Sequence, residues 1–216
     1  MYIVDRTTRL VRGFLLSYGP TRIKRAVWDK EYSDNKWHFA ENSAGDCIYP
    51  YLEKYVRNGS ILDIGCGSGN TANEMTPTYQ SYVGVDISKE ALEKAAKRSE
   101  RNGRQDKNRF ACSDFLDYVP TSQFDVILFR ESMYHVPMHR IKEILDYYAK
   151  YLKENGVLIV RMFIGASMTS ADGKKHRPAA MIGIMETEFE VVEKAEFDTP
   201  GRPAVIVLRP KVQAKR

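Results

Sequence analysis

The stretch Ile61-Leu-Asp-Ile-Gly-Cys-Gly-Ser-Gly-Asn70 decides the fold, because a short apolar run passes directly into a glycine-rich loop. An open α/β sheet places its ligand loop at this point, outside the carboxyl end of a strand. A dinucleotide-binding loop would want a glycine five residues after Gly65, where Asn70 stands, and Asp63 would repel a pyrophosphate. The loop therefore favours a nucleotide-like cofactor that carries no phosphate.

Strand and helix signals alternate on the C-terminal side of this loop, as a parallel sheet requires. Short apolar runs predict five buried parallel strands, at residues 60–64, 82–86, 109–112, 124–129 and 157–163. Two further strands, at 189–197 and 204–208, are joined by the turn signal Thr199-Pro200-Gly201 and so form a hairpin. The pattern predicts an α/β protein with one mostly parallel sheet.

Helix signals separate most of these strands. Ser88 is suited to cap a helix that ends at Asn102-Gly103, since a serine at this boundary accepts hydrogen bonds from free backbone amides. A second helix is expected to start near Pro137 and to end at Asn155-Gly156, and a short apolar helix follows near residues 179–185. The apolar face of the second helix consists of Ile141, Ile144, Leu145, Tyr148 and Leu152.

Residues 1–58 read as helices with two apolar faces, which predicts a cap over the sheet. Such a cap could gate a substrate pocket or merely cover the edge of the sheet. The first face consists of Leu10, Val11, Phe14 and Leu15, and the second of Ile48, Tyr51, Leu52, Tyr55 and Val56.

Length, cysteine content and charge narrow the class of protein. The 216 residues suit one α/β domain, and no apolar run approaches the ~18 residues of a membrane helix. Cys47, Cys66 and Cys112 indicate neither a disulfide framework nor a zinc ribbon and favour a reducing, cytoplasmic setting. The net charge of +5 leaves a nucleic-acid partner open, but the densest basic segments, 173–177 and 209–216, lack interleaved aromatic residues. We expect a monomer or homodimer with a small-molecule partner.

Three carboxylates stand in order at the ends of the first three predicted strands: Asp63, Asp86 and Asp114. S-adenosylmethionine has a cationic amine and a sulfonium and no phosphate, so a carboxylate beside the loop attracts it. Asp86 can accept hydrogen bonds from both ribose hydroxyls. Asp114 can accept from the adenine amine, while Phe115 offers its backbone amide to the ring. The ordered set fits three parts of one ligand.

These residues lie in segments, including Val83-Gly-Val-Asp-Ile-Ser88 and Ser113-Asp114, that resemble the successive motifs of class I S-adenosylmethionine-dependent methyltransferases. The likeness covers residues 60–163 directly, and the closing hairpin is similar to that family's last two strands. It implies a Rossmann-like, seven-stranded sheet in the order 3-2-1-4-5-7-6, with strand 7 antiparallel, and S-adenosyl-L-methionine as cofactor. The implied cofactor-binding residues are Tyr32, Asp63, Gly65, Gly67, Gly69, Asp86, Ile87, Asp114, Phe115 and Arg130.

The segment Phe129-Arg-Glu-Ser-Met-Tyr-His-Val-Pro137 ends the fourth strand and faces the sulfonium in this family. It lacks the Asn/Asp-Pro-Pro-Tyr/Phe signature of amino-group methylation on adenine or glutamine and the Pro-Cys pattern of cytosine-carbon enzymes. Its x-His-Val stretch is similar to that of many small-molecule enzymes. The candidate catalytic residues are His135, Glu131 and Tyr134. His135 could act as a general base or be a structural, hydrogen-bonded histidine, and Glu131 could instead pair with Arg130.

Upstream, the stretch from Trp28 to Trp37 resembles the aromatic lead-in that some small methyltransferases fold over the cofactor carboxylate and the substrate pocket. Both tryptophans are therefore candidate substrate-binding residues, although they could equally anchor the cap in the core. His135 and His139 have the spacing of a helical metal pair, but Pro137 places His135 outside the helix, so we expect no metal.

Together these patterns predict a single domain, with a helical cap or lid at residues 1–58 and a Rossmann-like cofactor-binding core at 59–216. The expected function is transfer of a methyl group to an O, N, C or S atom of a small molecule. RNA or protein methylation, and a non-catalytic regulatory module that binds S-adenosylmethionine, are the alternatives.

Overall fold

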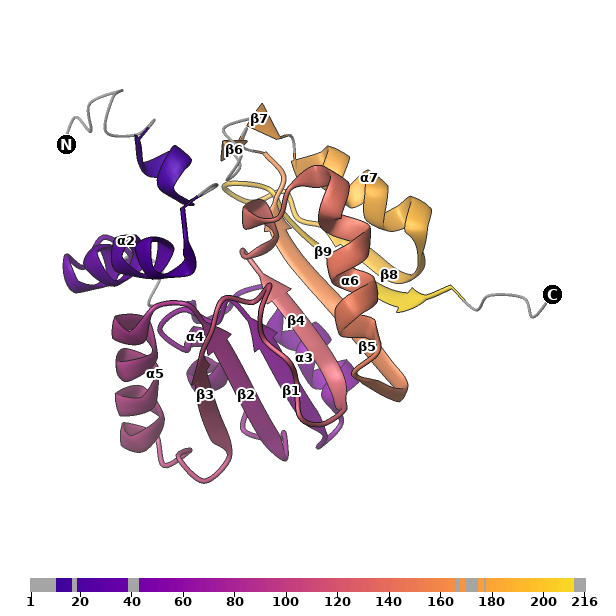
Figure 1. The fold of residues 1–216 in the computed structure, drawn as a ribbon. Helices are drawn as coiled ribbons and strands as arrows, with labels where there is room; N and C mark the ends of the chain where they lie inside the picture. The colour runs from indigo at the N-terminus through magenta and orange to yellow at the C-terminus, as the bar shows by residue number, and fades with distance from the viewer. Residues whose placement is uncertain are drawn as a thin grey trace.

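One seven-stranded sheet organises the protein, as Figure 1 shows. The computed structural model describes residues 11–16, 19–38, 43–165, 168–169, 175–176 and 178–211. The strand order is β3-β2-β1-β4-β5-β9-β8, and β9 runs antiparallel to both of its neighbours. The predicted order and the antiparallel seventh strand are therefore confirmed. The strands are β1 (Ser60–Ile64), β2 (Ser81–Asp86), β3 (Asn108–Cys112), β4 (Phe124–Arg130), β5 (Leu152–Phe163), β8 (Phe189–Glu196) and β9 (Pro203–Pro210).

Helices cover both faces of the sheet, because alternate side chains of a strand point to opposite faces. On β1, Leu62 joins a core cluster with helices α6 and α7, whereas its neighbour Ile61 joins a second cluster with α3 and α4. Figure 1 shows α6 and α3 on opposite sides of the sheet. The helices are α2 (Thr21–Ser33), α3 (Tyr49–Val56), α4 (Asn70–Glu74), α5 (Lys89–Arg101), α6 (Ile141–Ala149) and α7 (Pro178–Glu188), with 3-10 turns η2 (Met133–His135) and η3 (Met138–Arg140).

The helix after Pro137 is shorter than its apolar spacing predicts. Pro137 precedes η3, α6 ends at Ala149, and Leu152 begins β5 rather than continuing the helix. Asn155-Gly156 lies inside β5, where pairing with β4 jumps from Leu152 to Val157. A Cβ at Gly156 would lie 2.9 Å from the Phe124 carbonyl oxygen, so the glycine allows the two backbones to approach here rather than ending a helix.

The two apolar faces predicted within residues 1–58 differ in outcome. Residues 11–16 are helical, but the side chains of Val11 and Phe14 are 53% and 64% exposed, so the first predicted face is wrong at these positions, and Leu10 lies outside the described residues. The second face is confirmed at Ile48, Leu52 and Val56, which are buried against the sheet. The division into a cap and a core stays a prediction.

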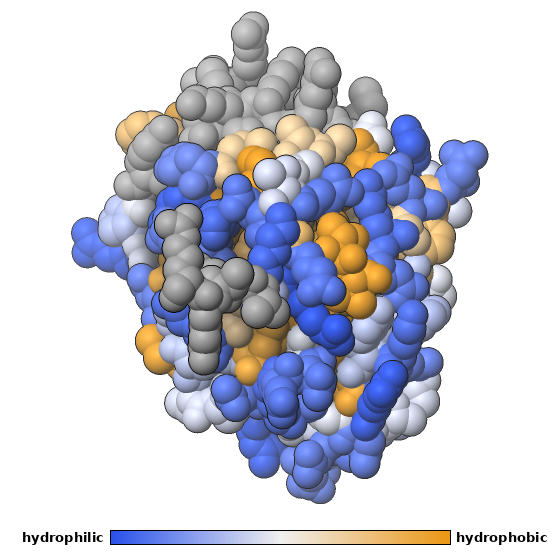
Figure 2. All heavy atoms as spheres, turned by 90° about the vertical axis from the view of Figure 1, so that its right-hand side faces the viewer, coloured by the Kyte–Doolittle hydropathy of each residue, from blue (hydrophilic) through white to orange (hydrophobic). Residues whose placement is uncertain are grey.

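The sheet ends at β8, whose exposed edge is rich in charge. Glutamates and a lysine alternate with smaller apolar residues along this strand, which discourages pairing with another chain. Figure 2 shows this side of the molecule as mostly hydrophilic, with small hydrophobic patches between the charged residues. Among the described residues, no helix has the length and apolar character that a membrane span requires.

Candidate active site

A cavity of about 780 Å³ opens at the carboxyl ends of the strands. Pockets of roughly 300–1,000 Å³ are typical of small-molecule sites. The N-terminal segment, the glycine loop and the ends of β4 and β5 all contribute to its lining. With the exception of Gly69, all candidate site residues from the sequence analysis line this cavity. They are Trp28, Tyr32, Trp37, Asp63, Gly65, Gly67, Asp86, Ile87, Asp114, Phe115, Arg130, Glu131, Tyr134 and His135.

The glycine loop needs its first two glycines for backbone conformation and for space. Gly65 and Gly67 have φ values of +77° and +54°, a region that disfavours residues with a Cβ. A Cβ at Gly65 would lie 2.6 Å from the Cβ of Ser132, and one at Gly67 would lie 2.7 Å from the Tyr32 hydroxyl. The loop therefore lies directly against the N-terminal segment on one side and the β4 loop on the other.

Gly69 has a different place. It precedes α4 with a φ of +73°, and a Cβ there would lie 2.7 Å from the Cβ of Ala95 on α5. The third glycine allows close packing of two helices and does not line the cavity, so its expected contact with the cofactor finds no support in its position.

Asp63 is buried with one oxygen unpaired. Its Oδ2 accepts a hydrogen bond of 2.6 Å from the Tyr82 hydroxyl, while its Oδ1 has no partner within the described chain. Burial raises the pKa of Asp63 to about 6. The hydroxyl of Ser132, which also lines the cavity, is the second buried oxygen without a partner. Unpaired buried polar atoms are costly, so both fit a bound polar ligand.

Asp86 organises the glycine loop from the end of β2. Its Oδ2 accepts from the backbone N–H of Gly67 and its Oδ1 from that of Ser88, each at 2.9 Å. Burial raises its pKa to about 6 although these bonds favour the ionised form. The carboxylate is thus fixed at the cavity edge with lone pairs available to hydroxyl donors.

The residues that follow β3 also line the cavity. Asp114 accepts a hydrogen bond of 3.1 Å from the Leu116 N–H at Oδ1, and its Oδ2 lies 3.5 Å from the Lys24 ammonium. Arg25 donates to the carbonyl of Ile87 at 3.1 Å. We call Asp63, Gly65, Gly67, Asp86, Ile87, Asp114 and Phe115 the strand-end wall.

Helix α2 is fastened to this wall by residues that sequence reasoning missed. Ser88 caps α5 as predicted, since its Oγ accepts from the Ala91 N–H at 3.2 Å. The same hydroxyl donates to Asp29 at 2.7 Å, and Lys94 donates to the Tyr32 carbonyl at 2.9 Å. These bonds join positions about 60 residues apart in the chain, and no local sequence signal marks such pairs.

An ion-pair network closes the cavity beside β4 and β5. Arg130 donates to Asp46 at 2.8 Å, and the same carboxylate lies 3.1 Å from the Arg161 guanidinium, which also pairs with Glu131. Although burial opposes ionisation, the two guanidiniums hold the pKa of Asp46 below its usual value. The predicted alternative pairing of Glu131 with Arg130 is replaced by pairing with Arg161. We call Asp46, Arg130, Glu131 and Arg161 the Asp46 network.

Glu131 and Tyr134 are both engaged by the protein. Glu131 has a φ of +58°, which is strained for a residue with a Cβ, and burial raises its pKa. The Tyr134 hydroxyl donates to the Phe163 carbonyl at 3.1 Å and accepts from the Phe163 N–H at 2.6 Å. Burial raises the pKa of Tyr134 far above its usual value, so its proton stays in place.

His135 faces a group of aromatic side chains. Its ring meets that of Trp28 edge-on at 5.2 Å between centroids, and Trp28 packs at 5.6 Å against Trp37. Burial, with a smaller effect of the Arg12 charge, lowers the pKa of His135 to about 4, which leaves the imidazole neutral at pH 7. Within the described chain the ring makes no hydrogen bond, so the structural alternative has no partner there. We call Trp28, Trp37, His135 and Phe163 the aromatic wall.

A second ion pair lies beside this wall, and its arginine, Arg12, lines the cavity. Arg12 donates to the two carboxylate oxygens of Glu31 at 2.6 Å and 3.0 Å, and the Trp37 indole donates to the same carboxylate at 3.2 Å. The guanidinium also lies 5.3 Å from the centre of the Trp28 ring. Although burial opposes ionisation, Arg12 holds the pKa of Glu31 below its ordinary value.

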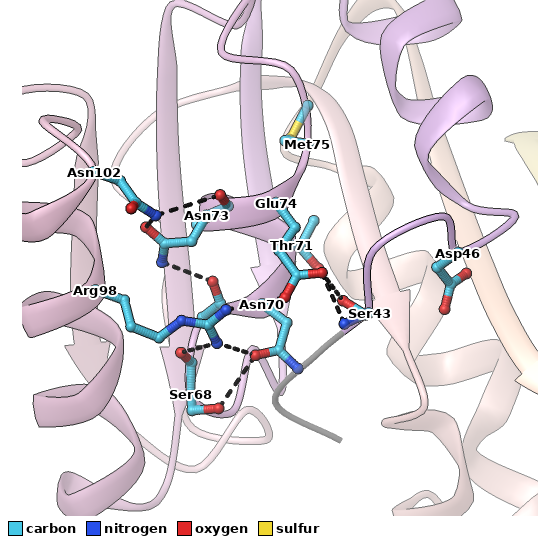
Figure 3. A network of polar contacts seen from close by, with 12 residues as sticks. Ser43, Asp46, Ser68, Asn70, Thr71, Asn73, Glu74, Met75, Arg98 and Asn102 are labelled. Carbon is cyan, nitrogen blue, oxygen red and sulfur yellow. Dashed lines mark hydrogen bonds and ion pairs between the residues drawn. The ribbon is translucent and has the colours of Figure 1, made fainter. Parts of the chain in front are cut away.

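The loop at Ser43 is tied to the back of the glycine loop. Ser43 donates to Glu74 through its backbone N–H at 2.7 Å and its hydroxyl at 2.9 Å, and Glu74 pairs with Arg98 at 3.0 Å. Arg98 also donates to Asn70 and, at 3.4 Å, to the Ser68 carbonyl. In Figure 3 Glu74 lies between Arg98 and Ser43, so one chain of contacts joins α5, the glycine loop and the cavity wall.

A sequence family matches the central part of the chain. The family described as "Methyltransferase domain" matches residues 61–156. A ubiquinone biosynthesis O-methyltransferase of Pelagibacter ubique is 31% identical over 123 residues, which are 57% of this chain and 50% of that protein. Sterol 24-C-methyltransferase erg6 of Aspergillus fumigatus is 26% identical over 153 residues, which are 65% of this chain and 40% of that protein. The matched segments thus span half or less of these relatives.

Solved structures share the fold. The N-methyltransferase NodS from Bradyrhizobium japonicum WM9, in complex with S-adenosyl-L-homocysteine, superposes with a TM-score of 0.67 at 18% identity, over 87% of this chain and 98% of that one. Magnesium protoporphyrin IX methyltransferase from Synechocystis, with bound S-adenosyl-L-homocysteine, gives 0.65 at 14% identity, over 88% and 99%. The domain match, the curated relatives and the observed strand order support a class I S-adenosylmethionine-dependent methyltransferase, and the solved structures share its fold.

Proposed function

We propose that the chain transfers a methyl group from S-adenosylmethionine to a small molecule held in the cavity. One observation carries the proposal: Asp63 and Asp86, which face the cavity from the ends of β1 and β2, form no ion pair with any described residue. Two unpaired carboxylates at one end of a cavity favour a ligand with positive charge. S-adenosylmethionine brings an amine and a sulfonium.

The strand-end wall offers contacts to successive parts of S-adenosylmethionine, in the order of the strands. The unpaired Oδ1 of Asp63 is placed to accept from the amine, Asp86 from the ribose hydroxyls, and Asp114 from the exocyclic amine of adenine. The side chain of Ile87 would cover a face of the adenine ring, and the Phe115 amide would meet its edge. Arg130 and Tyr32 also line the cavity, and the Arg130 guanidinium could donate a further hydrogen bond to the cofactor carboxylate while it stays paired with Asp46.

The aromatic wall would hold the acceptor beside the reacting methyl. When bound, S-adenosylmethionine supplies an electrophilic carbon, to which the acceptor's lone pair bonds while the carbon–sulfur bond breaks and its electrons go to sulfur. Holding the acceptor in line with that carbon supplies much of the rate. Trp28, Trp37 and Phe163 provide flat apolar surface for this positioning.

Among the three catalytic candidates, the geometry favours His135. Its imidazole is neutral and lines the cavity, so it can accept the acceptor's proton as the new bond forms. The hydroxyl of Tyr134 is occupied on both sides by Phe163, and Glu131 is paired with Arg161. We assign positioning roles to Tyr134 and Glu131.

Two measurements test the proposal. Calorimetry with S-adenosylmethionine and S-adenosylhomocysteine should give binding that Asp86→Ala weakens, and absence of binding to both ligands would reject the proposal. A mass-spectrometric screen of a metabolite extract should then show one compound gaining the mass of a methylene group. If the protein binds the cofactor but methylates only RNA or protein, or nothing at all, one of the two alternatives replaces the small-molecule function.

A further inference from the structure

The charges that line the cavity are distributed unevenly. The two lining carboxylates that form no ion pair with a described residue, Asp63 and Asp86, both lie in the strand-end wall. At the other end, every charged side chain has an opposite charge beside it. Arg12 is paired with Glu31, while Arg161 and Arg130 share Asp46 and Glu131 within the Asp46 network.

The pairing around the aromatic wall leaves no net charge to offer a ligand. Three guanidiniums meet three carboxylates there, and the Arg12–Glu31 pair is bidentate, the geometry that best satisfies both groups. Glu31 receives a further bond from the Trp37 indole. A charged acceptor would have to break one of these pairs or lie uncompensated against an apolar surface, and both are costly.

The remaining surface there is flat and apolar. Trp28 and Trp37 pack together, Phe163 faces the same cavity, and the neutral imidazole of His135 stands at the edge of Trp28. Flat walls of this kind suit a planar ring, which offset or edge-to-face stacking stabilises.

From these observations, and resting on the proposed methyl transfer, we infer that the acceptor is an uncharged aromatic compound methylated on a hydroxyl oxygen. An amine can attack with its own lone pair and lose its proton afterwards, whereas a hydroxyl is a weak nucleophile until its proton leaves. His135 accepts that proton while the oxygen takes the methyl carbon, and the electrons of the carbon–sulfur bond go to sulfur. The positive charge of the sulfonium thereby passes to the imidazole.

Three matched probes test the acceptor class in the protein saturated with S-adenosylhomocysteine, which prevents turnover. They are catechols that carry a methyl group, a carboxylate or an aminomethyl group. Calorimetry should show the methyl catechol binding at least about tenfold more tightly than either charged probe. Equal or tighter binding of a charged probe overturns the inference. Binding of S-adenosylhomocysteine is measured first. If it does not bind, the proposed function fails; if it binds and the probes show no preference, only the acceptor class fails.

Two reciprocal substitutions change the charge of the site without removing a wall residue. Glu31→Gln leaves the Arg12 charge uncompensated, so the carboxylate probe should gain about tenfold in affinity. Arg12→Gln leaves the Glu31 charge, so the aminomethyl probe should gain instead. Because both variants are predicted to gain binding, a misfolded protein cannot imitate the result, and unchanged preference in both variants overturns the charge argument.

Turnover identifies the acceptor atom. With S-adenosylmethionine and the aminomethyl catechol, whose nitrogen and oxygens compete within one molecule, the methyl group should appear on oxygen. Methylation on nitrogen overturns the assignment. Trp28→Leu should weaken binding of the methyl catechol, and Trp28→Phe, which keeps a flat ring, should restore most of it; equal loss in both variants contradicts stacking.

Discussion

The strand-end wall and the aromatic wall enclose the same cavity but are built in opposite ways. Asp63, Asp86 and Asp114 stand at or just beyond strand ends, so the backbone of the sheet fixes them. Backbone N–H groups orient Asp86 and Asp114, and the Tyr82 hydroxyl orients Asp63. Trp28 comes from helix α2, Trp37 from the turn that follows it and His135 from the 3-10 turn η2, and the Trp28 ring contacts the other two.

The electrostatic contrast follows the structural one. The strand-end wall keeps two carboxylates that form no ion pair within the described chain, whereas charges near the aromatic wall are neutralised in pairs. One wall therefore selects a ligand by charge and the other by shape. Substitutions in the strand-end wall should change the affinity for the methyl donor. Substitutions in the aromatic wall should change the rate of methyl transfer and the choice of acceptor.

The largest effect should come from His135→Ala. Loss of a general base typically costs about 10²- to 10⁴-fold in rate, and we expect kcat with a hydroxyl acceptor to fall in this range. Calorimetry should give an unchanged affinity for S-adenosylhomocysteine, because His135 lies in the other wall. The matched control is His139→Ala, an exposed histidine on the adjoining turn. A full rate in His135→Ala would remove the residue from the mechanism.

The next largest effect should be the loss of donor affinity in Asp86→Ala. Removal of charge-assisted hydrogen bonds should weaken binding of S-adenosylhomocysteine about 10- to 100-fold. The substitution also leaves the N–H groups of Gly67 and Ser88 without their acceptor. Asp117→Ala, at an exposed carboxylate three residues beyond Asp114, serves as control. If Asp86→Ala and Asp117→Ala bind S-adenosylhomocysteine with the same affinity, the assignment of donor binding to the strand-end wall is wrong.

A smaller effect on stability should separate Gly69 from the wall. Gly69→Ala places a Cβ against Ala95, and overpacking of this kind costs about 1–3 kcal/mol in the free energy of unfolding. Gly103→Ala is a matched control, because Gly103 also has a positive φ but an open surrounding. Denaturant unfolding should show the larger loss in Gly69→Ala, with donor affinity retained in the folded protein. Equal losses would mean that backbone strain alone is responsible.

The last effect is a dependence of the affinity for the methyl donor on pH. Burial raises the pKa values of Asp63 and Asp86 to about 6, so below that pH they take up protons and no longer attract a cationic amine. Because the folded protein holds protons on Asp63 and Asp86 more tightly than the unfolded chain does, protonation of these two groups stabilises the folded, ligand-free protein. This stabilisation is lost as the pH rises through 6.

Calorimetry between pH 5 and pH 8 should show affinity for S-adenosylhomocysteine falling by up to about tenfold per unit below pH 6 for each carboxyl that titrates. Asp63→Asn should bind more weakly and with a shallower pH profile. A profile in Asp63→Asn as steep as that of the parent would assign the effect to other groups.

The strand-end wall could be predicted from the sequence because its geometry is local. A short apolar run, a glycine loop and a carboxylate at a strand end suffice to place Asp63 and Asp86, and the strand order follows from the resemblance to class I methyltransferases. The same local reasoning failed where two periodicities coincide: Leu152 fits the helical spacing of its predecessors but begins β5.

The other residues of the site could not be predicted, because their partners are distant in sequence. Asp46 meets Arg130 and Arg161 across 84 and 115 positions, and neither distance follows from periodicity or turn chemistry. No local sequence signal pairs Arg12 with Glu31, which meet only once the chain is folded. The basic segments at 173–177 and 209–216 lie largely outside the described residues, so the expectation about them stays a prediction.

The bond between Tyr134 and Phe163 has a practical consequence. The Phe163 amide proton is held by a side-chain hydroxyl rather than by a neighbouring strand, although Phe163 lies at the end of a central strand. Its hydrogen exchange should therefore report when the turn that carries His135 separates from the sheet. A single amide can time the opening of the aromatic wall without an acceptor, a dye or a label.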